Sequence, residues 1–148
     1  MFQSLIAQLG ASAMVLVCGF AILRGRWPER VSAAALAVNW LACEAFEDWH
    51  RTAKVQPVIF GIDVGYDLLL LGLTLTTQRI WIVCAFAFQS LIVLIHVLSV
   101  YDPILDRLEF FEAYYVLSFG ILVALAIGTG LEGRSAPRLP SRRTSAMG

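Results

Sequence analysis

Five long apolar runs constrain this chain more than any other feature of its sequence. Each run approaches or exceeds the roughly 20 helical residues that cross a bilayer core about 30 Å thick. Backbone polar groups in lipid must be paired within the protein, so each run is expected to form a helix. The sequence therefore predicts an all-α helical bundle with five transmembrane helices, over residues 3–23, 31–49, 57–77, 80–101 and 111–131.

The composition agrees with a membrane protein. Of the 148 residues, 59% are hydrophobic and 15% are charged, whereas about a quarter are charged in soluble domains. The mean hydropathy is +0.75. Neither a basic low-complexity region nor a metal-finger spacing of cysteines is present, so we predict no nucleic-acid partner, no cofactor and no metal site. A single transmembrane bundle is expected over residues 1–132, followed by a disordered basic cytoplasmic tail over residues 133–148.

The basic residues divide unevenly between the two sets of connections. Eight fall on one side of the membrane, at Arg24, Arg26, Arg30, Arg79, Arg134, Arg138, Arg142 and Arg143, and three on the other, at Arg51, Lys54 and Arg107. Loops rich in Lys and Arg stay in the cytoplasm. We therefore predict a multi-pass protein of the bacterial inner (plasma) membrane, with its N-terminus outside and its C-terminus in the cytoplasm.

Two carboxylates interrupt the third apolar run. Asp63 and Asp67 are four residues apart, so they lie on one face of a helix, and this stripe continues through Thr74 and Gln78. An ionised Asp at the centre of a bilayer costs about 2.5 to 3.5 kcal/mol on insertion scales. These side chains are therefore expected to face protein or water.

The short connection at residues 78–79 predicts a tight antiparallel hairpin. Counting outward from this turn, Asp67 and Gln89 lie at similar depths, and Asp63 and His96 differ by about 3 Å at 1.5 Å per residue. We therefore expect the two acids to meet Gln89 and His96 across the hairpin, with two residues of the second run deep enough to join them. The predicted polar seam comprises Asn39, Glu44, Asp63, Asp67, Gln89 and His96.

Small residues form two further stripes that are typical of helix packing in membranes. One lies nearly opposite the acids of the third run, at Gly61, Gly65 and Gly72. The other recurs every four residues in the fifth run, at Gly120, Ala124 and Gly128. These stripes would serve either within the bundle or between subunits, and the sequence leaves both alternatives open.

Three classes of function are compatible with such a seam. The favoured one is a non-catalytic accessory or structural subunit of a membrane assembly, because polar pairs in membranes average only about 0.6 kcal/mol and so contribute specificity. Its partners would be the lipid bilayer and either another membrane protein or a second copy. The alternatives are a proton- or cation-coupled transport protein that uses the seam, and a metal-dependent intramembrane enzyme.

Several short motifs are similar to those of a known group of proteins. The motifs are Gln78-Arg79-Ile80-Trp81, Phe88-Gln89, His96, Ala113-Tyr114 and Ala126-Ile127-Gly128-Thr129. With them the chain resembles, over roughly residues 57–130, small multi-span bacterial inner-membrane proteins that remain uncharacterised. The resemblance implies the membrane class and implies Asp63, Gln89, His96 and Tyr114 as positions to test. It implies no activity.

Overall fold

The computed structural model describes residues 2–46, 57–101 and 107–134, and almost all of these residues are helical. The predicted all-α fold is confirmed, and the third and fourth helices have the predicted bounds. The five helices are α1 (Phe2–Arg24), α2 (Trp27–Phe46), α3 (Pro57–Thr77), α4 (Ile80–Tyr101) and α5 (Arg107–Arg134). Residues 135–148, which make up most of the predicted tail, lie outside the described residues.

Helix α2 begins at Trp27, four residues before the predicted start. Pro28 occupies the first turn, where its missing N–H would have had no helical partner. The Glu29 carboxylate accepts a hydrogen bond from the backbone N–H of Arg26 at 2.9 Å, which is half of a capping box. These local features bring a charged residue, Glu29, into the helix rather than leaving it in a loop.

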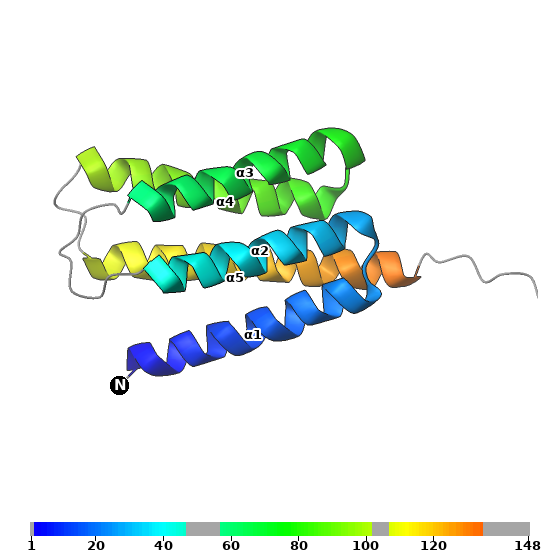
Figure 1. Ribbon diagram of the computed structural model, residues 1–148, viewed down its shortest axis with the longest axis horizontal. Coiled ribbons are helices and arrows are strands. Elements are labelled where there is room, and N and C mark those ends of the chain that lie inside the picture. Colours follow the sequence, from blue (N-terminus) through cyan, green and yellow to red (C-terminus); the bar gives the residue numbers. More distant parts are fainter. Residues whose placement is uncertain (1, 47–56, 102–106, 135–148) are drawn as a thin grey trace, which may run out of the picture.

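Successive helices run in opposite directions (Figure 1). Helix α3 packs against α2 and α4, α5 packs against α4, and α1 packs against α2 and α5. The α1–α2 turn, the α3–α4 turn and the end of α5 consequently lie together at one end of the bundle. We call this the basic end, because Arg24, Arg26, Arg30 and Arg79 lie in its two turns or in the helix ends beside them.

Three helical segments are long and apolar enough to cross a membrane: Pro57–Thr77, Ile80–Ser99 and Glu112–Leu131. The apolar part of α1 within the described residues, Gln8–Arg24, is shorter, and α2 is not among the three. Helix α2 falls short because polar residues interrupt it. Length and composition therefore support three of the five predicted spans.

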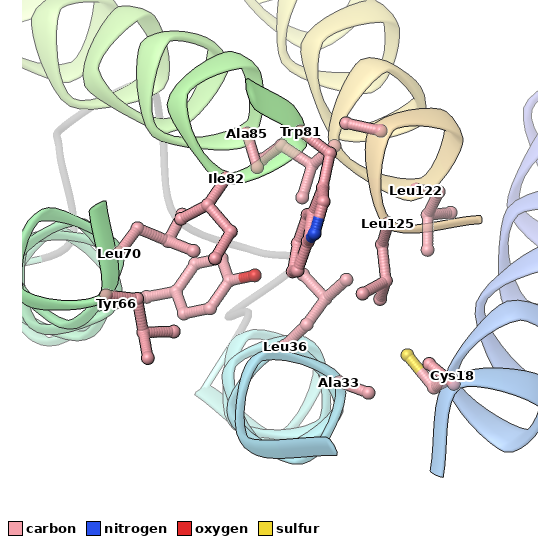
Figure 2. Close-up of a cluster of buried hydrophobic side chains, with 14 of the residues drawn as sticks. Cys18, Ala33, Leu36, Tyr66, Leu70, Trp81, Ile82, Ala85, Leu122 and Leu125 are labelled. Atoms are coloured by element: carbon pink, nitrogen blue, oxygen red, sulfur yellow. The ribbon is translucent and has the colours of Figure 1, made fainter. Parts of the chain in front are cut away.

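The apolar core lies between α2, α4 and α5, with contributions from α1 and α3 (Figure 2). Trp81 of α4 is directed into this core, beside Leu36 and Leu125. A Cβ atom on Gly128 would lie 2.4 Å from a Trp81 ring atom, and one on Gly120 would lie 3.0 Å from the Phe88 ring. The stripe of small residues on α5 thus makes room for aromatic side chains of α4, so it serves within the bundle.

The glycines of α3 have a different environment. The buried face of this helix consists of Asp63, Tyr66, Leu70 and Leu73, and Gly61, Gly65 and Gly72 lie on the opposite, exposed face. A Cβ atom on any of these three glycines would meet no atom within 4 Å. Within the described part of the chain, no helix packs against this glycine face, so only a packing role between subunits remains a prediction.

Candidate functional site

The Asp63 side chain is fully buried and joins three helices. Its Oδ1 atom accepts hydrogen bonds from Asn39 Nδ2 of α2 at 3.2 Å and from Gln89 Nε2 of α4 at 3.1 Å. Its Oδ2 atom lies 3.0 Å from His96 Nε2 of α4. Asn39, Asp63, Gln89 and His96 together form what we call the Asp63 hub.

Most of the predicted seam is present in this hub. The contacts of Asp63 with Gln89 and His96 are confirmed, and Asn39 joins them from α2 as expected. The hairpin formed by α3 and α4 explains why Asp63 lies level with its partners. Its two-residue turn fixes the relative depth of α3 and α4, and Gln89 also donates to the backbone carbonyl of Asp63 at 3.2 Å.

Asp67 does not belong to the hub, so this part of the prediction is wrong. Its Oδ1 atom accepts a hydrogen bond from Ser90 Oγ at 2.9 Å, and its side chain is only half-buried. The buried face of α3 runs through Tyr66 rather than Asp67, which turns Asp67 toward the flank of α4. Ser90 is thus a polar partner that sequence reasoning did not identify.

The other predicted members of the stripe and seam lie elsewhere. Thr74 is half-buried, and its Oγ1 atom has no hydrogen-bond partner among the described residues. Gln78 is exposed and ends α3 in a left-handed conformation with φ of 50°. Glu44 belongs to α2, but its side chain lies outside the described residues.

Aromatic side chains enclose the imidazole of His96. The ring centroids of Phe60 and Tyr114 each lie 6.0 Å from it, in edge-to-face arrangements. The Tyr114 hydroxyl in turn lies 3.9 Å from Cys43 Sγ. These contacts orient the imidazole toward Asp63 and leave only 4% of the residue exposed.

The hub favours a charge-balanced pair. A carboxylate alone in the interior would carry a large desolvation cost, and so would an imidazolium alone. A carboxylate and an imidazolium in direct contact have no net charge, and the Asn39 and Gln89 amides donate hydrogen bonds that stabilise a carboxylate at Asp63. The described contacts of the pair include the uncharged side chains of Asn39, Gln89 and Tyr114, from α2, α4 and α5 respectively.

Two buried polar pairs near the basic end were not predicted. Arg79 donates to Glu29, whose side chain is fully buried, and the hydroxyls of Ser32 and Tyr66 lie 3.2 Å apart. The signal that could have found Glu29 is its position three residues after Arg26, directly behind a proline. The second helix was predicted to start at residue 31, so Glu29 was assigned to a loop.

The arrangement of the potential metal-ligating side chains also bears on the alternative of a metal-dependent enzyme. No group of three or more His, Cys, Asp or Glu side chains that could hold a metal ion occurs within residues 2–46, 57–101 and 107–134 whose side chains are described. The hub itself supplies one carboxylate and one imidazole, and its remaining members are amides. Hard divalent ions take more oxygen ligands than this.

Comparison with models of known protein families gives no match, and comparisons with curated proteins and with solved structures give none either.

Proposed function

We propose that this chain is a proton-coupled integral membrane protein of the bacterial inner membrane. In this proposal all five helices span the bilayer, the N-terminus lies outside and the basic end faces the cytoplasm. Three helices of sufficient length and hydropathy support the membrane assignment. The position of Arg24, Arg26, Arg30 and Arg79 at one end of the bundle supports the orientation.

The observation that carries the proposal is the direct contact of Asp63 with His96, at 3.0 Å, inside this bundle. Ionisable residues within membrane helices are costly, and they commonly mark proton or ion pathways. A purely structural contact between α3 and α4 could be made by two amides without that cost. Two ionisable groups in direct contact, by comparison, can take up and release a proton.

The chemical step is the exchange of one proton with water. In one state Asp63 is a carboxylate and His96 an imidazolium, so the pair holds one proton. A hydronium ion then gives up a proton, which forms an O–H bond on the Asp63 carboxylate and leaves water. The pair now holds two protons and carries a net charge of +1, so the imidazolium is no longer balanced and the added proton is readily released to water again.

Asp63→Asn is expected to abolish this exchange while keeping the fold, because the carboxamide has the same shape but does not titrate in this way. Infrared difference spectra of the protein in lipid, recorded between alkaline and acidic pH, would detect the protonated carboxylic acid of Asp63. We expect one carbonyl band that Asp63→Asn removes and Asp67→Asn retains. Identical spectra for the wild type and Asp63→Asn would contradict proton exchange at this pair.

A second candidate function is that of an accessory subunit of a membrane assembly. The specific observation in its favour is the exposed glycine face of α3, where Gly61, Gly65 and Gly72 have no neighbour within 4 Å of a Cβ position. Small residues on a membrane helix allow a second backbone to approach closely. A partner helix or a second copy would bind there.

Gly65→Leu tests this second function. The new side chain points away from the bundle, so the fold is expected to remain intact while association through the glycine face is lost. Cross-linking in membranes, followed by identification of the linked chains, measures the association. Asp63→Asn serves as the matched control and should leave it unchanged. Equal cross-linking of Gly65→Leu and wild type would exclude this face as the interface.

A further inference from the structure

Three buried polar residues follow one face of α2 from the basic end toward the hub. They are Glu29, Ser32 and Asn39, with exposed fractions of 0%, 1% and 7%. Their separations of three and seven residues place them on the same side of the helix. We call them the α2 polar face. Leu36 is the apolar residue that separates Ser32 from Asn39 on this side.

Each member of the α2 polar face contacts a polar group on α3 or on the turn that precedes α4. Glu29 pairs with Arg79, Ser32 with Tyr66, and Asn39 with Asp63. Tyr66 lies one helical turn from Asp63 on α3. The Arg79 side chain is 21% exposed, so the series begins at an accessible residue and ends at the buried hub.

Two buried atoms beside this series lack hydrogen-bond partners among the described residues, namely Asn39 Oδ1 and Trp81 Nε1. Figure 2 shows the Tyr66 hydroxyl directed from α3 into the interior and the Trp81 ring in the core beside Leu36 of α2. A buried polar atom without a partner costs about 1 to 3 kcal/mol. Buried waters in proteins typically bond such groups.

We infer that the α2 polar face is a hydrated proton path between the hub and the basic end. Waters bound at Asn39 Oδ1 and Trp81 Nε1 connect Asp63 with the Tyr66–Ser32 pair and with Glu29. A proton moves by hopping: each hydroxyl oxygen gains one proton as its own O–H bond breaks, so the number of protons on the path is unchanged. The inference rests on the proposed proton exchange at Asp63 and His96.

Tyr66→Phe tests the path, because it removes the hydroxyl and keeps the ring within the core. The full chain is reconstituted in lipid vesicles that contain a pH-sensitive dye, and a potassium diffusion potential drives protons across the membrane. We expect protein-dependent flux in the wild type and a loss of about tenfold or more in Tyr66→Phe. Ser32→Ala, which removes the partner hydroxyl, should have the same effect and replaces Tyr66→Phe if that variant does not insert.

Ser12→Ala is the matched control. Ser12 is exposed on α1, and its hydroxyl donates to the Gln8 carbonyl of its own helix at 2.8 Å, so its removal should leave the flux unchanged. Wild-type flux in Tyr66→Phe and Ser32→Ala, or the absence of any protein-dependent flux, would overturn the path. The infrared band of Asp63 reports separately on proton exchange, so the path can fail while the proposed function stands.

Discussion

Asp63→Ala is expected to lower the free energy of unfolding by about 2 to 5 kcal/mol. The lower value is the sum of three membrane polar contacts at about 0.6 kcal/mol each. The upper value is the cost of breaking a buried ion pair and leaving its partner behind. In this variant Asn39 and His96 lose their contact with the carboxylate, and Gln89 keeps only its contact with the backbone carbonyl of residue 63. Unfolding in mixed micelles, followed by tryptophan fluorescence, measures the change.

Asp67→Ala is the matched control for that experiment. It removes the same chemical group from the same helix one turn away, but it deletes only the contact with Ser90. We expect a loss of about 1 kcal/mol, which is typical of a single hydrogen bond. Equal losses for the two variants would show that Asp63 is not the residue that joins α2, α3 and α4.

Gly128→Leu is expected to destabilise the bundle by about 3 kcal/mol or more, because overpacking of a filled core forces side chains and backbone to shift. A Cβ atom at this position would lie 2.4 to 2.6 Å from atoms of the Trp81 ring. The indole cannot move freely, since it is buried between α4 and α5. Thermal unfolding in detergent, followed by circular dichroism, measures the loss.

Gly130→Leu provides the control on the same helix. No atom lies within 4 Å of its Cβ position, and replacing a helical glycine contributes about 0.5 to 1 kcal/mol of helix stability. This variant should therefore be neutral or slightly stabilised. Trp81→Ala should also reduce the cost of Gly128→Leu in the double variant, because residues in contact are energetically coupled. Additive losses would contradict the contact.

Sequence reasoning located the hub where local geometry was sufficient. The two-residue turn between α3 and α4 fixes their relative depth, so counting residues brought Asp63 level with His96 and Gln89. Asn39 was expected to join because of its depth in the second apolar run. These are consequences of helix rise and of an enforced antiparallel pairing, and they need no knowledge of the other helices.

The rotation of α3 about its own axis could not be predicted by counting residues from the turn. Polar residues alone suggested a face that contains both Asp63 and Asp67, whereas the buried face runs through Tyr66, Leu70 and Leu73. Which side of α3 is buried depends on where α2 packs against it. The sequence of α3 alone does not determine this. The Glu29–Arg79 pair was hidden for a related reason, since it joins two turns that are distant in the sequence.

The central claim is that Asp63 and His96 face each other inside the lipid-embedded bundle. Solid-state NMR of the full chain in bilayers, with ¹⁵N-labelled histidine and ¹³C-labelled aspartate, measures this contact directly. The account predicts strong dipolar coupling between His96 Nε2 and the Asp63 carboxyl carbon, as their 3.0 Å nitrogen-to-oxygen distance requires. Coupling of His96 to lipid acyl chains instead, with none to Asp63, would contradict it.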